Sequence, residues 1–120
     1  MPQSLLLISR SAPWSGLTAR ETLDIALAGG AFELPISMLF LDDAVLQLRP
    51  AQQPSALQQK DLQANLSALP MFGIEQLYAC GHSLQQRGLT PEQLSLEVQV
   101  LNQAQLRELI DQHDQVITFS

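Results

Sequence analysis

The chain has 120 residues, of which 46% are hydrophobic and 15% charged, and its formal net charge at pH 7 is −6. This length predicts one domain, residues 1–120, with a core of its own. The six basic side chains are scattered, which argues against direct binding to nucleic acid, and the apolar runs are too short to cross a membrane. The amino end lacks the pattern of a signal peptide and a single cysteine cannot form an internal disulfide, so the sequence predicts a cytoplasmic protein.

The first part of the chain predicts two strands joined by a helix. Residues 4–9 and 36–41 are largely apolar without alternation, which is typical of strands buried on both faces. Between them, Thr18 and Glu21 have the spacing of a capping box, and the helix that they begin is expected to end at the glycine pair 29–30.

The segment after the second strand predicts a short turn and a longer helix. Asp43 can cap a turn through residues 44–48, after which a loop flanked by prolines follows. Ser55 and Gln58 then have capping-box spacing, and leucines at i, i+4 and i+7 continue the helix to near Pro70.

The rest of the chain predicts three more strands with helical segments between them. Gly88 is placed to end the first of these segments, Pro91 to begin a short turn, and Asn102 to cap the last helix. The expected strands are residues 77–79, 97–101 and 116–119. Because strands that are separated by helices need crossover connections, the sequence predicts an α/β fold, a three-layer sandwich with a mainly parallel five-stranded sheet.

The only cysteine, Cys80, follows the third predicted strand, and a short helical turn is predicted shortly after it, at residues 84–87. That position is the carboxyl edge of the sheet, where open α/β proteins place ligands. Backbone N–H groups at the start of a helix would also favour a thiolate there. The alternative is structural, since a free cysteine packs well as a small apolar residue. His82 lies two residues further on and could stabilise a thiolate if its ring folds back, although neighbours at i and i+2 on a helix point apart.

Other kinds of site have less support. No glycine-rich phosphate loop follows the first strand. Asp42 and Asp43 are oxygen ligands that Mg²⁺ could use, but a strand stop and a helix cap also explain them. His82 and His113 have no second ligand at metal-binding spacing, so neither a metal nor another cofactor is expected. His113 lies on the apolar side of its helix and is expected at the edge of the core.

Several stretches carry a resemblance to a known family: SAPWSG with ARETLDIAL, FLDDAVLQLRPAQQP, IEQLYACGHSLQQRGL and the final VITFS. In this order, over nearly the whole length, they resemble the DsrE/DsrF-like family, and within it the TusC/DsrF-type subunits of sulfur-relay complexes. The resemblance implies a flavodoxin-like α/β fold and a heterotrimer with one D-type and one B-type subunit, dimerised to a hexamer. Such an assembly passes persulfide sulfur to an E-type carrier, towards 2-thiolation of wobble uridine in tRNA, or serves dissimilatory sulfur oxidation.

The resemblance leaves the role of Cys80 open. In this family the sulfur-carrying cysteine belongs most firmly to the D-type subunit, at a strand-to-helix junction, and Cys80 occupies a similar junction. One hypothesis is that Cys80 carries persulfide itself, with His82 beside its thiolate, which requires an accessible thiol. A second hypothesis is that the chain is mainly an assembly or scaffold subunit. A third is that it is a small-molecule or nucleotide-binding module that uses the same sheet edge without covalent chemistry.

Apolar side chains in predicted loops indicate a surface for partner subunits, because a lone domain usually places polar residues there. The alternative is that they tuck under their own loops. A tryptophan in the first loop could also form a wall of the thiol pocket. The candidate partner-binding residues are Trp14, Val45, Leu46, Leu48, Met71 and Phe72.

Overall fold

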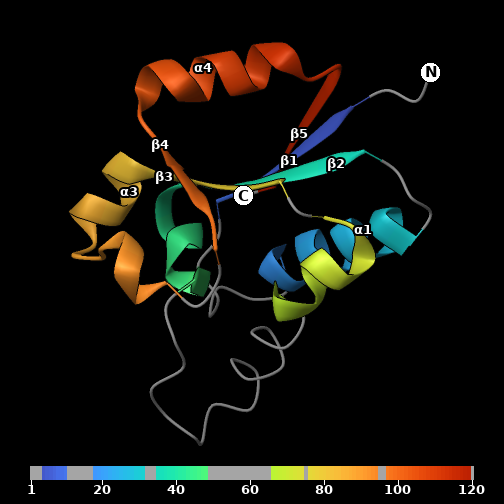
Figure 1. The fold of residues 1–120 in the computed structure, drawn as a ribbon, viewed down its shortest axis with the longest axis horizontal. Coiled ribbons are helices and arrows are strands. Elements are labelled where there is room, and N and C mark those ends of the chain that lie inside the picture. Colours follow the sequence, from blue (N-terminus) through green and yellow to red (C-terminus); the bar gives the residue numbers. More distant parts are fainter. Residues whose placement is uncertain are drawn as a thin grey trace, which may run out of the picture.

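Five parallel strands form one sheet in the order β4-β3-β2-β1-β5 (Figure 1). The computed structural model describes residues 4–10, 18–31, 35–48, 66–74, 76–94 and 97–119. The prediction of an α/β fold with a mainly parallel five-stranded sheet is confirmed. The strands are β1 (Leu5–Ser9), β2 (Ile36–Phe40), β3 (Gln76–Cys80), β4 (Gln99–Leu101) and β5 (Gln115–Phe119).

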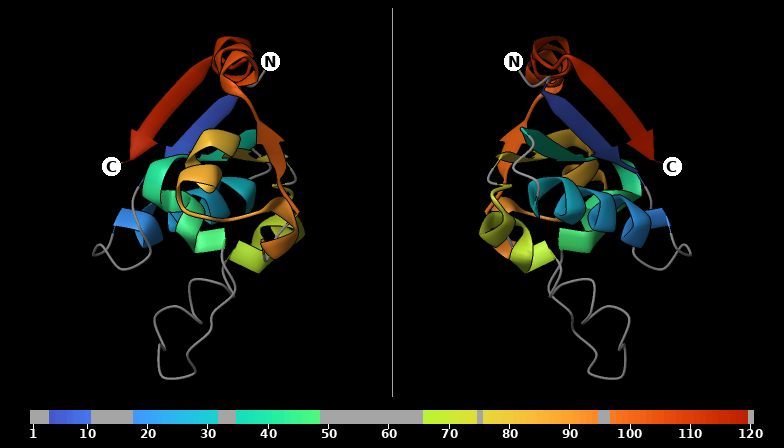
Figure 2. Two further views of the ribbon diagram at one scale, coloured as in Figure 1. Left: turned by 90° about the vertical axis from the view of Figure 1, so that its left-hand side faces the viewer. Right: turned by 90° about the vertical axis from the view of Figure 1, so that its right-hand side faces the viewer.

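Helical segments cover both faces of this sheet, which makes the fold three layers deep (Figures 1 and 2). Three of them lie on one face: α1 (Thr18–Ala31), the 3₁₀ segment η1 (Asp42–Leu48) and α3 (Gly81–Gln86). The second 3₁₀ segment, η2 (Leu69–Phe72), packs against α1. On the opposite face, α4 (Gln103–Gln112) is the only helical segment among the described residues.

The direction of the crossovers explains why α4 lies on a different face from α1 and α3. From β1 to β4 the chain moves steadily towards one edge, whereas from β4 to β5 it crosses back to the far side of β1. Because parallel crossovers are right-handed, a reversal of direction places the connecting helix on the other face. None of the helices in the described ranges has the length and apolar content needed to span a membrane.

Two hydrophobic clusters hold the layers together, one on each face of the sheet. Alternate residues of β1 enter different clusters: Leu7 lies in the first, and Leu6 and Ile8 lie in the second. This arrangement explains why β1 is apolar without alternation. The first cluster contains the buried side of α1 and η1, and the second contains Leu109 of α4.

Most predicted helix ends and starts agree with the structure. Gly88 has φ +68° directly after α3, a conformation that glycine adopts without steric cost. Asn102 and Gln105 form a reciprocal capping box at α4, with both side-chain-to-backbone distances at 2.9 Å. The short segment η3 (Pro91–Gln93) begins with proline and also has a capping box.

Some boundaries differ from the predictions. Helix α1 continues through the glycine pair 29–30 to Ala31. Strand β4 begins at Gln99 rather than at residue 97, because its register with β3 starts at Tyr78. The predicted helix start at Ser55 lies outside the described residues, and the described part of that segment is helical at 66–68 before η2.

Candidate functional site

Cys80 is the last residue of β3 and the N-cap residue of α3. The predicted position at the carboxyl end of a strand is confirmed, but α3 begins at Gly81 rather than at residue 84. Its neighbour on β4 is Leu101, and its side chain lies on the α4 side of the sheet, since it alternates with Ala79 of the first cluster. The residue is only 6% exposed and its thiol is free. Helix α3 has six residues, fewer than two full turns, so its dipole is small.

Gly81 allows α3 to leave the strand close to β4. A Cβ atom at this position would lie 3.1 Å from Cγ1 of Val100 and 3.3 Å from the carbonyl oxygen of Leu101. Both distances are tighter than ordinary van der Waals contact. The missing side chain therefore fixes how near the start of α3, and with it Cys80, lies to the edge strand.

The exits of β2 and β3 are joined by a hydrogen bond between Asp42 and Ser83. Asp42 has φ +51°, a left-handed conformation that is uncommon for residues other than glycine, although aspartate tolerates it. Its backbone N–H donates to Oγ of Ser83 at 2.9 Å. Because Ser83 is 3% exposed, this bond ties the strained exit of β2 to the buried side of α3.

Two ion pairs lie around this junction. Nε of Arg10 donates to Oδ2 of Asp42 at 2.7 Å. Arg87 donates to Oδ1 of Asp43 through Nη2 at 2.8 Å and through Nε at 3.1 Å, and its Nη1 donates to the carbonyl oxygen of Ser83 at 3.1 Å. Both carboxylates thus meet arginine, and the described residues contain no group of three side chains suited to a metal ion.

A buried hydrogen bond joins η1 to the end of β1. Nε2 of Gln47 donates to Oγ of Ser9 at 3.1 Å, and the two residues are 3% and 1% exposed. Neither residue could be singled out from the sequence, because a glutamine between two leucines carries no signal of a partner 38 residues away.

The two histidines are placed differently. His113 is half-buried as expected, with Nδ1 at 2.7 Å from the carbonyl oxygen of Leu109 and Nε2 at 3.0 Å from Oγ of Ser37. His82 is exposed in the first turn of α3, and among the described residues no hydrogen bond joins it to Cys80. The role of His82 beside a thiolate stays a prediction.

The candidate partner-binding residues differ widely in how exposed they are. Val45 and Leu48 are fully buried in the first hydrophobic cluster, so the expectation that they offer partner surface is corrected. Their loop is apolar because η1 turns its side chains under itself onto the sheet. Leu46 is half-buried, while Met71 and Phe72 are 85% and 43% exposed. Trp14 lies outside the described residues.

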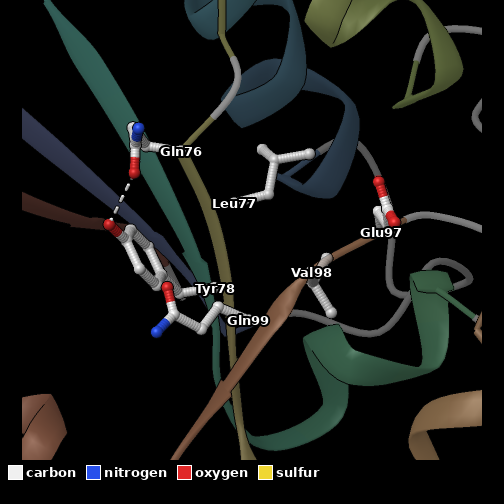
Figure 3. A pocket seen from close by; sticks show the side chains of 6 residues that line it. All are labelled: Gln76, Leu77, Tyr78, Glu97, Val98 and Gln99. Atoms are coloured by element: carbon white, nitrogen blue, oxygen red, sulfur yellow. Dashed lines mark hydrogen bonds between the residues drawn. The ribbon is translucent and has the colours of Figure 1, made fainter.

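A shallow hollow lies at the opposite end of the strands from Cys80. Its volume is about 250 Å³. It lies where residues 97–98, which lead into β4, diverge from β3 before the two strands begin to pair (Figure 3). Oη of Tyr78 donates to Oε1 of Gln76 at 2.9 Å on one side of it. Its lining residues are Gln76, Leu77, Tyr78, Glu97, Val98 and Gln99. The hollow is separate from the junction around Cys80, because Gln76 and Cys80 are the two ends of β3.

Comparisons with known proteins agree with this architecture. The chain is 64% identical over 118 residues to a "Protein TusC homolog" of Pseudomonas aeruginosa, which covers 98% of this chain and 99% of that protein. It is 38% identical over 115 residues to a "Protein TusC homolog" of Vibrio vulnificus, covering 96% of this chain and 98% of the relative. The crystal structure of the ychN protein from E. coli matches with a TM-score of 0.83 at 22% identity, over 98% of this chain and 99% of that one, and supports the fold.

A family model described as the DsrE/DsrF-like family matches residues 3–119. This match spans all the described strands and helices, and the relatives above cover the same length. The chain therefore belongs to the DsrE/DsrF-like family.

Proposed function

We propose that the chain is a subunit of a cytoplasmic sulfur-relay complex that passes persulfide sulfur towards 2-thiolation of tRNA wobble uridine, and that it acts mainly as an assembly subunit. The observation that carries this proposal is the near full-length likeness to proteins named as TusC homologs. The partners proposed are the D-type and B-type subunits of the same relay, in a heterotrimer dimerised to a hexamer, with an E-type carrier receiving the sulfur.

The surroundings of Cys80 support an assembly role over sulfur carriage. In persulfide transfer, the acceptor thiolate attacks the outer sulfur of the donor, the donor S–S bond breaks, and the donor leaves as a thiolate. This attack needs a thiol that a donor can reach. Cys80 is 6% exposed, and neither described ion pair at the junction involves it. Its burial suits a small apolar residue that packs the start of α3.

The exposed pair Met71 and Phe72 supports a partner surface next to α1. Both residues belong to η2, and the segment ends in Gly73 at φ +85°. The backbone of η2 lies directly against α1, since a Cβ built at Gly30 would be 2.5 Å from the carbonyl oxygen of Phe72. The two exposed side chains are therefore held on a rigid base, which lowers the entropy lost when a partner covers them.

Intact mass spectrometry tests which role Cys80 has. The wild-type chain and the Cys80→Ser variant are incubated with a cysteine desulfurase and cysteine, with and without the D-type partner. The proposal expects a thiol-reversible adduct of one sulfur atom on the partner and none on this chain, while native mass spectra show the two bound. An adduct on the wild-type chain that the Cys80→Ser variant lacks would instead establish Cys80 as a carrier and overturn the assembly role.

Matched charge substitutions test the partner surface. Phe72→Lys is expected to weaken binding to the partner subunits and to lower tRNA thiolation in cells, since it places a charge within the proposed contact. Ile110→Lys is the control, because Ile110 is similarly exposed, at 38%, but lies on α4 across the sheet. Equal loss of binding in both variants, or in neither, would contradict a contact at Phe72.

A further inference from the structure

Strand β5 is an edge strand of the sheet that the described residues form. It pairs with β1 over five residues, and in the described part of the chain no segment pairs with its outer side (Figure 2). Val116 and Ile117 are 37% and 42% exposed on this strand. They point to opposite faces of the sheet, because side chains alternate along a strand.

The backbone bonds at the two ends of β5 show which groups face outwards. The N–H of Gln115 donates to the carbonyl oxygen of Ser4, and the carbonyl oxygen of Phe119 accepts from the N–H of Arg10, both at 3.0 Å. Residues that bond towards β1 alternate along the strand, so 115, 117 and 119 face β1. The N–H and C=O groups of Val116 and Thr118 therefore point to the open side.

The two edges of the sheet differ in how they resist pairing with another strand. Natural edges are protected by short strands, charges, prolines or bulges. Strand β4, at the other edge, has three residues and follows the carboxylate of Glu97. Strand β5 has five residues in unbroken register with β1, and its sequence QVITF contains neither charge nor proline.

We propose that β5 pairs antiparallel with β5 of a second copy of this chain, about a two-fold axis at Ile117. Val116 of each copy then lies opposite Thr118 of the other, and the outward groups of these residues exchange four hydrogen bonds. The outward N–H and C=O groups of Val116 and Thr118 lie symmetrically on either side of Ile117. Each donor of one copy therefore meets an acceptor of the other. The two copies of Ile117 meet as a non-hydrogen-bonded pair, in which side chains approach most closely.

The charges around β5 favour antiparallel over parallel pairing. Each copy has a formal charge of −6, so two copies repel one another overall, but β5 itself brings no charged side chain into the contact. Asp114 lies directly before β5 and is held by the N–H of Ser4 at 2.8 Å. Antiparallel pairing separates the two copies of Asp114 by about 20 Å, beyond the screening length in physiological salt. Parallel pairing would bring them side by side.

Disulfide formation tests the predicted register. Ile117→Cys is expected to form a covalent dimer on mild oxidation, because the Cα atoms of such a pair lie about 4.5 Å apart and within reach of a disulfide. Val116→Cys is the matched control, since its two copies lie about 8 Å apart and cannot be bridged. Each variant is made in two backgrounds, one with Cys80→Ser and one with Cys80 retained. The first background excludes cross-links through Cys80, although this residue is buried. Equal cross-linking of the two variants, or none in either, would overturn the proposal.

Sedimentation velocity with Thr118→Pro tests the hydrogen bonds. Proline removes the outward N–H of residue 118 and leaves the bonds to β1 in place, and edge strands accept it in that orientation. The wild-type chain is expected to dimerise with rising concentration, and the variant to raise the dissociation constant about tenfold or more. Thr118→Val, which keeps the N–H, is expected to dimerise as the wild type does. A wild-type chain that stays monomeric, or that Thr118→Pro leaves unchanged, would show that the edge does not pair with a second copy. This test does not depend on the proposed role in sulfur relay.

Discussion

Oγ of Ser83 accepts the backbone N–H of Asp42 at 2.9 Å, across 41 residues of sequence. The bond satisfies a donor in the only left-handed residue other than glycine among the described positions. It also joins the end of β2 to the helix that follows Cys80. The geometry of the candidate site therefore depends on a contact between two strand exits.

Ser83→Ala is expected to lower the free energy of unfolding by about 1–3 kcal/mol, since it leaves the Asp42 N–H without its acceptor. Urea unfolding monitored by circular dichroism measures the change. Ser67→Ala is the control, because Ser67 is exposed in the helical turn before η2. A loss in Ser83→Ala no larger than that in Ser67→Ala would show that the bond contributes nothing.

The ion pair between Arg87 and Asp43 is expected to contribute little to stability. The side chains are 22% and 58% exposed, and exposed pairs of this kind are worth about 0.2–1 kcal/mol. A double-mutant cycle with Arg87→Gln and Asp43→Asn in urea measures the coupling. Added salt should reduce it further, because exposed charges are screened. A coupling above about 2 kcal/mol that salt leaves unchanged would contradict this estimate of an exposed pair.

The strands and their directions could be predicted from the sequence, but their order could not. Apolar runs without alternation marked β1 and β2 as buried, and the helices between strands required parallel crossovers. Nothing in the sequence VITF places β5 beside β1 rather than beside β4. That choice depends on which face of the sheet α4 packs against, a property of the assembled layers.

The candidate site shows the same division between local and distant information. The position of Cys80 at a strand-to-helix junction followed from local pattern. The bond from Gln47 to Ser9 did not, since it joins residues 38 positions apart. The burial of Val45 also depends on how η1 lies on the sheet, and an apolar turn looks the same in sequence whether it faces a partner or its own core.

Asn102→Ala is expected to destabilise α4, because the Asn102 side chain accepts the N–H of Gln105 in the capping box. Loss of such a cap costs about 1 kcal/mol, within a range of about 0.5–2 kcal/mol. Asn102→Asp keeps the acceptor and should retain most of the stability. Thermal and urea unfolding compare the two variants, and equal stability of Asn102→Ala and the wild type would mean that the cap is not formed in solution.

Gly30→Ala tests the contact that supports the exposed pair Met71 and Phe72. In a helix interior, glycine to alanine is ordinarily stabilising by about 1 kcal/mol, and in the last turn, where Gly30 lies, the gain is smaller. Here the new Cβ would lie 2.5 Å from the carbonyl oxygen of Phe72 and 3.1 Å from Cδ1 of Ile74, and a backbone atom cannot rotate away. Overpacking of this kind costs about 1–3 kcal/mol, so the net change is expected to be a loss.

The matched control for this clash is Ala28→Gly, at an exposed position of the same helix. Ala28→Gly should lower the free energy of unfolding by about 1 kcal/mol through helix propensity alone. The measured loss gives the propensity difference between alanine and glycine in α1 without a clash, and this difference can be compared with the change in Gly30→Ala. Urea unfolding gives both values. Because η2 must shift to admit the Cβ, Gly30→Ala should also weaken partner binding, whereas Ala28→Gly should leave it unchanged. A Gly30→Ala variant that is more stable than the wild type would show that η2 does not pack on α1 as described.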